Sequence, residues 1–166
     1  IPAETQARDE FGQPLFEDVG EPELLAKTRC RVLVTPHPGE FSRLFGVHMD
    51  EIEHKICALA QAIAEQYLIT VLLKGPVTAI AAPGEKLACS FLGNSGLAKG
   101  GSGDVLSGIL GAMAVRGLPL PAAARAGAFL HGRAAGLAAG EWGPDSMLPT
   151  DVAGALGKAF LESAGR

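Results

Sequence analysis

The sequence lacks an excess of basic residues, a signal sequence and any apolar run long enough to cross a membrane. Among its 166 residues, 14 Lys and Arg stand against 18 Asp and Glu, so the net charge is −4 and no basic stripe for nucleic acid is present. Residues 1–18 are polar and lack the basic start and apolar core of a signal peptide. These absences predict a cytoplasmic protein with neither nucleic acid nor a membrane as partner.

Cysteine is scarce as well. The three cysteines, Cys30, Cys57 and Cys89, are an odd number, lie far apart in the sequence and form neither a CxxC pair nor a Cys/His ligand set. Disulfide frameworks belong to oxidising compartments and to small, cysteine-rich domains. The sequence therefore predicts three reduced, buried thiols and no disulfide.

What the chain does contain is typical of one globular domain. Apolar residues make up 48% of the chain and charged residues 19%, a composition that favours a folded core over disorder. Residues 1–30 mix charges with prolines and show no apolar period, so they are predicted to form a loop or linker. Because the chain begins with Ile1 and not Met, we expect further sequence upstream, and we assign residues 31–166 to one domain.

Strand and helix signals alternate from residue 31 onward. Short apolar runs at 31–35 and 68–73 predict two buried strands, with an amphipathic helix over 50–67 between them. A helix of this length between two strands is typical of a parallel βαβ unit. Segments 78–82 and 86–91 flank a Pro-Gly-Glu turn and predict a hairpin that adds antiparallel edge strands. The predicted fold class is therefore α/β.

Further helices complete the predicted layers. Asp50, with Glu53 three residues on, and Thr150 are the residues expected to cap helix starts. The alanine- and glycine-rich helix at 121–140 is expected to pack closely on its neighbour, because small side chains let backbones approach. The other predicted helices cover residues 40–46, 105–116 and 150–160.

A glycine-rich stretch directly precedes one of these helices. Gly100, Gly101, Ser102 and Gly103 lead into Asp104. The backbone N–H groups of such a turn can converge on an anion, and the positive end of the helix adds to the attraction. Asp104 would stay ionised there, a weak base that suffices for phosphoryl transfer. A plain loop with an Asp cap is the alternative, and the polar residues at nearby strand ends favour the anion hole.

Polar residues also follow both predicted buried strands. His37 lies between two prolines after the first strand and is expected to contact substrate. Glu40 fits either a first-turn residue that serves the helix dipole or a group that holds water on Mg²⁺. After the second strand, Lys74 would reach nucleotide phosphates and Thr78 would hydrogen bond nearby, although the Gly-Pro pair between them also fits an ordinary turn.

Other polar residues are weaker candidates. His48 and His54 lie on or near a solvated helix face, and Trp142 and Asp145 lie in a loop rich in Gly and Pro, so none of them is assigned chemistry. His131 is interpreted as a buried histidine whose hydrogen bonds are satisfied.

Three motifs in one order resemble the NAD(P)H-hydrate dehydratase family, a branch of the ribokinase-like superfamily often labelled carbohydrate kinase. They are Val34-Thr35-Pro36-His37-Pro38-Gly39-Glu40-Phe41, Leu73-Lys74-Gly75 with Thr78, and the stretch from Gly93-Asn94 to Gly108. The resemblance implies a ribokinase-like three-layer αβα fold with a mainly parallel sheet. Residues 31–166 would then be the carboxyl-terminal part of its catalytic domain, truncated at the N-terminus.

The activity implied by the resemblance is that of a lyase in nicotinamide-hydrate repair. Such an enzyme dehydrates NADHX and NADPHX by phosphorylating the 6-hydroxyl group from ADP or ATP with Mg²⁺ and then eliminating phosphate. The resemblance places His37 and Asp104 on the hydrated dinucleotide, with Asp104 catalytic, and Glu40 near Mg²⁺ through water. The nucleotide-binding residues that it implies are Lys74, Gly75, Pro76, Val77, Thr78 and Gly103.

Departures from the family pattern shape the remaining expectations. Lys99 stands where the family often has a hydroxyl residue, Pro76-Val77 replaces a smaller pair, and the family's amino-terminal glycine-rich half is absent. We therefore expect the isolated chain to be inactive. An upstream epimerase domain and a homo-oligomer are compatible with the resemblance. The alternative functions are a ribokinase-like kinase of a vitamin or sugar hydroxymethyl group and a catalytically silent nucleotide-binding module.

Overall fold

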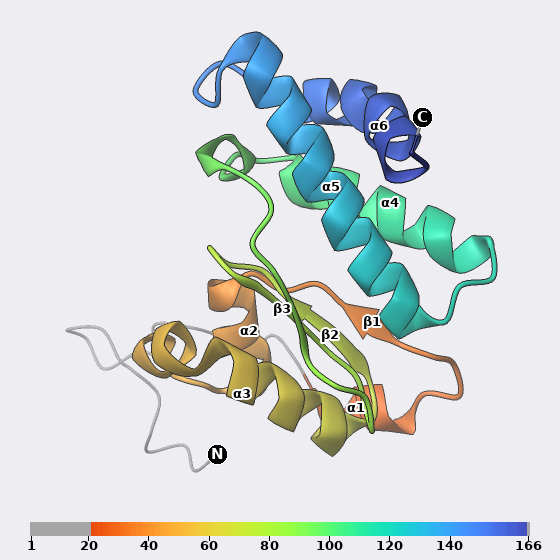
Figure 1. Cartoon of the computed structure of the whole chain (residues 1–166). Helices are drawn as coiled ribbons and strands as arrows, with labels where there is room; N and C mark the ends of the chain where they lie inside the picture. The colour runs from red at the N-terminus through yellow and green to blue at the C-terminus, as the bar shows by residue number, and fades with distance from the viewer. Residues whose placement is uncertain (1–20, 166) are drawn as a thin grey trace.

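The chain folds into a sheet with helices packed on both of its faces (Figure 1). The computed structural model describes residues 21–165. Four strands lie in the order β1-β2-β3-β4, and their bounds are Leu33–Val34, Thr70–Leu73, Thr78–Ala81 and Ala88–Ser90. Each strand lies within a segment predicted to be one, and the α/β class is confirmed.

The sheet is mixed. β1 and β2 run parallel, with Leu33 opposite Thr70, because α2 (Pro38–Phe45) and α3 (Met49–Tyr67) provide the long crossover between them. β3 returns antiparallel beside β2 after the short connection 74–77, and β4 pairs antiparallel with β3. In the described residues the antiparallel pairs therefore outnumber the parallel one, whereas the resemblance implies a mainly parallel sheet. The connection 74–77 is too short for a crossover, so β2 and β3 can pair only as a hairpin.

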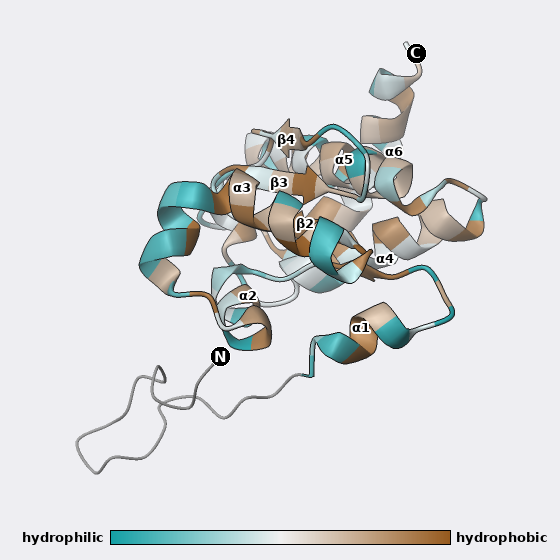
Figure 2. Cartoon of the chain, turned by 90° about the horizontal axis from the view of Figure 1, so that it is seen from below, coloured by the Kyte–Doolittle hydropathy of each residue, from teal (hydrophilic) through white to brown (hydrophobic). Residues whose placement is uncertain are grey.

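Alternate residues of β2 face opposite helical layers. Val71 and Leu73 pack in one core with Phe41 of α2. Leu72 packs on the other side of the sheet with Leu106. Because successive side chains of a strand point to opposite faces, β2 is buried on both sides, which explains its unbroken apolar run. Figure 2 shows β2 and β3 in the hydrophobic colour.

Two helices of the second half of the chain, α4 (Ser102–Val115) and α5 (Leu120–Trp142), cover the other face of the sheet (Figure 1). The last helix, α6 (Pro149–Ser163), packs on α5 and α4. A Cβ atom on Gly127 would lie 2.5 Å from Leu110 Cδ2, so the close packing predicted for the alanine- and glycine-rich helix is confirmed. Within residues 21–165, no helix combines the length and the apolar character that a membrane crossing demands.

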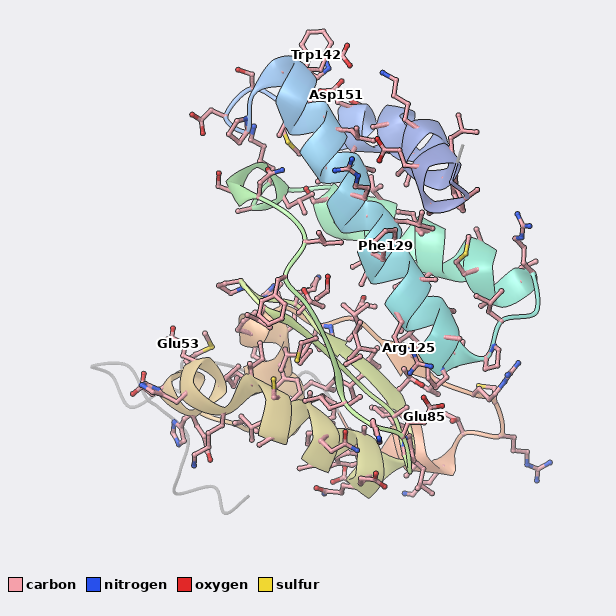
Figure 3. The ribbon with its side chains drawn as sticks, viewed as in Figure 1. Glu53, Glu85, Arg125, Phe129, Trp142 and Asp151 are labelled. Atoms are coloured by element: carbon pink, nitrogen blue, oxygen red, sulfur yellow. The ribbon has the colours of Figure 1, made fainter. Side chains whose placement is uncertain are left out.

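Polar contacts join α5 to the sheet and to the loop that follows β4. Arg125 Nη1 lies 2.7 Å from Glu85 Oε2, in the turn between β3 and β4 (Figure 3). Asn94 Nδ2 donates to the Ala135 carbonyl at 3.0 Å, while Asn94 Oδ1 accepts from the Gly96 N–H at 2.9 Å. These contacts fix the start of the glycine-rich segment against α5.

Part of the predicted linker is helical. The short helix α1 (Glu23–Lys27) lies inside residues 1–30 and follows Pro22. Proline suits a helix start, because its φ is already helical and it has no N–H to leave unpaired. Residues 1–20, which make up most of the predicted linker, lie outside the described part of the chain.

Two predicted helix caps are wrong. α3 follows His48, and Asp50 lies inside the first turn of the helix. At the start of α6, Asp151 rather than Thr150 makes the capping contact, since the Leu148 N–H donates to Asp151 Oδ2 at 2.7 Å. In both places an acidic residue follows the helix start, where its negative charge interacts favourably with the helix dipole.

The prediction of three buried thiols is also wrong. Cys30 and Cys89 are exposed and Cys57 is half-buried, and all three are free thiols. Cys89 lies in β4, which pairs with β3 on one side only among the described strands. Composition alone gave no reason to expect exposure, because free cysteines are among the residues most often buried.

Candidate functional site

The glycine-rich segment forms the entry to α4, as predicted. Gly101 precedes the helix with a φ of 94°, in the left-handed region that favours glycine. The Ser102 N–H donates to the Lys99 carbonyl at 3.2 Å, and the Asp104 N–H donates to the Gly101 carbonyl at 3.1 Å. The loop is therefore a compact turn that leads into the positive end of a helix.

A lysine outside the predicted site holds this loop in place. Lys99 Nζ donates to the carbonyls of Asp145 at 2.7 Å and Met147 at 2.8 Å. A Cβ atom on Gly96 would lie 2.5 Å from the Pro144 carbonyl oxygen, so the loop and the α5–α6 connection are in close contact. Lys99, a departure from the family pattern, thus positions the loop, and Asp145 takes part through its backbone.

His37 begins α2 as its N-cap residue. Its Nδ1 accepts from the Glu40 N–H at 3.2 Å, while the His37 N–H donates to Glu40 Oε2 at 2.7 Å, and the two bonds form a capping box. Because Nδ1 accepts, a neutral His37 carries its proton on Nε2, which lies 3.4 Å from Glu40 Oε1. Of the two roles left open for Glu40, the structure shows the one at the helix start.

Lys74 joins the two strand-end motifs. Its N–H donates to the Pro36 carbonyl at 2.9 Å, and its Nζ lies 3.7 Å from Glu40 Oε2. Burial alone would raise the pKa of Glu40, but the hydrogen bond from the His37 N–H and the charges of Lys74 and His37 outweigh burial and lower it. A Cβ atom on Gly103 would lie 3.3 Å from Lys74 Nζ, so the ammonium group also reaches the start of α4.

All three motifs line one cavity of about 1190 Å³. A typical small-molecule site occupies about 300–1000 Å³, so this cavity is large enough for a nucleotide-sized ligand. Asp104 is exposed in the first turn of α4. All predicted site residues except Val77 lie on the cavity wall. Those on the wall are His37, Glu40, Lys74, Gly75, Pro76, Thr78, Gly100, Gly101, Ser102, Gly103 and Asp104.

Within the described part of the chain, two side chains on the cavity wall have unpaired buried atoms that sequence reasoning did not foresee. Ser102 Oγ and His131 Nε2 are buried and have no hydrogen-bond partner among residues 21–165. Burial lowers the pKa of His131, a hydrogen bond with the Ser102 backbone opposes that effect, and the charge of Lys74 lowers the pKa further. His131 is thus buried as predicted but not satisfied. No sequence signal places residue 131 beside residue 102, because the contact depends on how α5 packs against α4.

No group of three or more His, Cys, Asp or Glu side chains within the described range is arranged to hold a metal ion. At the cavity, Glu40 is already engaged with the His37 N–H and lies near Lys74. A metal site built from protein ligands alone therefore does not fit these residues. A magnesium ion held mainly by phosphates and water, with Glu40 behind the water, does fit.

Comparisons with known proteins agree with the motifs. The family model described as NAD(P)H-hydrate dehydratase matches residues 16–158. The bifunctional NAD(P)H-hydrate repair enzyme Nnr of Escherichia coli (strain K12) is 39% identical over 150 residues, which are 89% of this chain and 29% of that protein. The ADP-dependent (S)-NAD(P)H-hydrate dehydratase of Neisseria meningitidis serogroup B is 40% identical over 131 residues, 72% of this chain and 44% of that one.

A solved structure is similar over most of the chain. The ADP/ATP-dependent NAD(P)H-hydrate dehydratase of Bacillus subtilis, co-crystallised with ATP and Mg²⁺, has a TM-score of 0.72 and 34% sequence identity, and the match covers 80% of this chain and 48% of that one. This chain therefore spans less than half the length of each of these three proteins. The fold is ribokinase-like, and the chain belongs to the NAD(P)H-hydrate dehydratase family.

Proposed function

We propose that the protein carrying this chain is a nucleotide-dependent NAD(P)H-hydrate dehydratase, a lyase that restores NADH and NADPH from NADHX and NADPHX. The observation that carries this proposal is the arrangement of Lys74 between Glu40 and the glycine of the α4 entry, Gly103, on the wall of one cavity. The activities named for the Neisseria and Bacillus relatives support the same reaction.

The nucleotide phosphates would lie at the glycine loop. Gly103 leaves open the space that a Cβ atom would fill beside Lys74 Nζ, and Ser102 Oγ lacks a partner among the described residues. An ammonium group and a helix N-terminus both attract a phosphate. Gly75, Pro76 and Thr78 on the adjoining wall would hold the rest of the nucleotide, and Val77, which is set back from the cavity, would support that turn through its backbone.

Asp104 would act as the base for phosphoryl transfer. It would accept the proton of the 6-hydroxyl group as that oxygen forms its bond to the terminal phosphorus and the bond from phosphorus to the leaving phosphate oxygen breaks. The lone pair of the ring nitrogen would then expel the new phosphate group to leave an iminium ion, and loss of a proton from C5 to the released phosphate or to water would restore the dihydronicotinamide ring. Asp104 lies in the first turn of α4, where the helix dipole favours a negative charge.

His37 would contact the hydrated dinucleotide. Its Nδ1 accepts from the Glu40 N–H, so donation to a substrate oxygen would come from Nε2, which would exchange its 3.4 Å contact with Glu40 Oε1 for the substrate. The capping box fixes the ring at the cavity wall, which lowers the entropy lost on binding.

Magnesium would assist through the phosphates. When bound, Mg²⁺ neutralises charge that develops on the transferred group. Glu40 would hold water on the ion, and Lys74 would share the negative charge of the phosphates with it. The ion pair between Glu40 and Lys74 keeps both groups at the same part of the cavity.

The identity of the nucleotide, an upstream domain and the oligomeric state are further parts of the proposal. The Neisseria relative is named ADP-dependent, and the Bacillus structure was obtained with ATP and Mg²⁺, so both nucleotides are candidates for this protein. The E. coli relative is named bifunctional. An epimerase domain upstream in the same protein and a homo-oligomer remain predictions.

Recovery of nicotinamide absorbance from the hydrate tests the proposal. In the full-length protein we expect turnover with ADP or ATP in the presence of Mg²⁺ and none without nucleotide. Nucleotide binding without hydrate turnover would instead favour the silent binding module, and a stable phosphorylated alcohol as product would favour a vitamin or sugar kinase. The 166 residues alone are predicted to be inactive, a prediction that robust turnover by them would contradict.

A further inference from the structure

Two of the three cysteines meet at the edge of the sheet, away from the proposed chemistry. Cys57 Sγ in α3 and Cys89 Sγ in β4 lie 3.5 Å apart. The residues are 32 positions apart in the sequence, so only the packing of α3 on the sheet brings the two thiols together. Cys30 is exposed in the coil before β1.

The alternation of β4 explains why Cys89 points toward α3. Its neighbour Ala88 packs in the core on the α4 and α5 side of the sheet, and its other neighbour, Ser90, lines the cavity. Because successive side chains of a strand alternate between faces, Cys89 lies on the opposite face, which α3 covers. Cys57, on the side of α3 that faces the sheet, packs against the edge of the core, and its thiol contacts the thiol of Cys89 there.

The geometry suits a covalent bond between the two sulfurs. A disulfide needs a separation of about 2 Å, so the thiols must approach by about 1.5 Å, a distance that small changes of the side-chain torsions supply. β4 pairs with β3 on one side only in the described sheet, so no second neighbouring strand restrains it there. Burial raises the pKa of the Cys89 thiol, and the hydrogen bond and charge of Cys57 raise it further. The thiolate that reacts is therefore a minor form at neutral pH, and the exchange should become faster as the pH rises.

We propose that Cys57 and Cys89 are a reversible thiol modification site that reacts with a low-molecular-weight disulfide such as oxidised glutathione. The exposed Cys89 thiolate attacks one glutathione sulfur, so that a mixed disulfide forms and one glutathione thiolate leaves. The Cys57 thiolate then attacks the Cys89 sulfur and expels the second glutathione. In total, two protein thiols are oxidised to one disulfide and one glutathione disulfide is reduced to two thiols.

The bond would link β4, which lines the cavity, to α3, which contacts the wall of the cavity from behind. Ile56, next to Cys57, reaches the turn of the proposed nucleotide segment, since a Cβ atom on Gly75 would lie 3.0 Å from Ile56 Cδ1. Ser90, next to Cys89, lines the cavity itself. Oxidation would thus restrain α3 and β4 relative to each other and raise the stability of the chain. The inference rests on the thiols and does not depend on dehydratase activity.

Thiol counting in a glutathione redox buffer tests this site. The full-length protein is equilibrated at increasing ratios of oxidised to reduced glutathione, the thiols are trapped with an alkylating agent, and the modified residues are identified by mass spectrometry. We expect Cys57 and Cys89 to lose alkylation together, with the protein lighter by two hydrogen atoms, while Cys30 remains alkylated. Excess dithiothreitol should restore both thiols, and the thermal midpoint of the oxidised protein should be higher by about 5 °C or more.

Serine variants distinguish the internal bond from other reactions. Cys30→Ser should leave the paired loss of alkylation unchanged, whereas Cys57→Ser and Cys89→Ser should abolish both the internal disulfide and the rise in thermal midpoint. Stable mixed disulfides on Cys57 or Cys89 without an internal bond would overturn the proposal. Dimers linked through Cys30, or full alkylation of Cys57 and Cys89 at every buffer ratio, would overturn it as well.

Discussion

The two walls of the cavity are built in different ways. At the strand ends, the predicted functional side chains hold one another, because His37 and Glu40 cap α2 together and Glu40 pairs with Lys74. At the glycine loop, residues outside the predicted site hold the backbone, through Lys99 and its two carbonyl partners. The proposed function and the structural support therefore fall on the same residues on the first wall and on different residues on the second.

This difference decides which substitutions separate activity from stability. On the strand-end wall, removing a side chain changes the helix cap, the ion pair and the substrate contact at once. On the loop wall, the chemistry is assigned to Asp104, whereas the architecture depends on Lys99 and Asn94. Substitutions on the two walls should therefore differ in how far they change activity and stability together.

The largest effect is expected from Asp104→Asn. The substitution removes the proposed base, and general-base catalysis is worth about 100- to 10,000-fold in rate. Because Asp104 is exposed, the thermal midpoint should change little, and nucleotide affinity should be largely retained. The measurement is hydrate turnover in the full-length protein beside calorimetric nucleotide titration. Asp145→Asn is the matched control, since Asp145 takes part in the site through its carbonyl only; an undiminished rate in Asp104→Asn would remove the assigned role.

The next largest effect is expected from Gly96→Ala. The added Cβ would meet the Pro144 carbonyl oxygen at 2.5 Å and Met147 Sδ at 2.6 Å, and such overpacking costs about 1–3 kcal/mol of the free energy of unfolding. Gly100→Ala, in the same loop, is the control, because no atom lies within 4 Å of its Cβ position. Denaturant unfolding measures both variants. Equal stabilities would show that the loop and the α5–α6 connection are not in the close contact described.

Two lysines, one on each wall, allow a direct comparison. Lys99→Met removes two hydrogen bonds to carbonyls and should lower the free energy of unfolding by about 1–2 kcal/mol. Lys74→Met removes the proposed phosphate contact and should weaken nucleotide binding about 10-fold, with a smaller change in stability because its ion pair is partly exposed. Unfolding curves and nucleotide titrations of both variants test this. If Lys74→Met were the more destabilising variant, the contrast between the walls would be wrong.

The sequence was informative where local patterns decide structure. The apolar runs predicted β2 and β3, and the polar residues at their ends, Lys74 and Thr78, line one cavity with the glycine loop. Contacts between distant residues were not predictable in this way. Lys99 reaches carbonyls 46 and 48 positions away, and the contact of Cys57 with Cys89 depends on the tertiary packing of α3. The parallel pair of β1 with β2 and the antiparallel strands of the hairpin also followed from local pattern and from the lengths of the connections.

The smallest effect is expected from Glu40→Gln, which removes charge and retains an acceptor for the His37 N–H. Because the fold lowers the pKa of Glu40, its charge stabilises the folded protein above the ordinary carboxyl pKa of 4.5, and this contribution is lost as the pH falls through the lower pKa of the folded state. With about half of the side chain exposed, we expect a difference below about 1 kcal/mol at neutral pH. Denaturant unfolding from neutral to acidic pH measures it, with Glu53→Gln on the exposed face of α3 as control (Figure 3). A difference that persisted at the most acidic pH would show that the Glu40 carboxylate does not stabilise this wall through its charge.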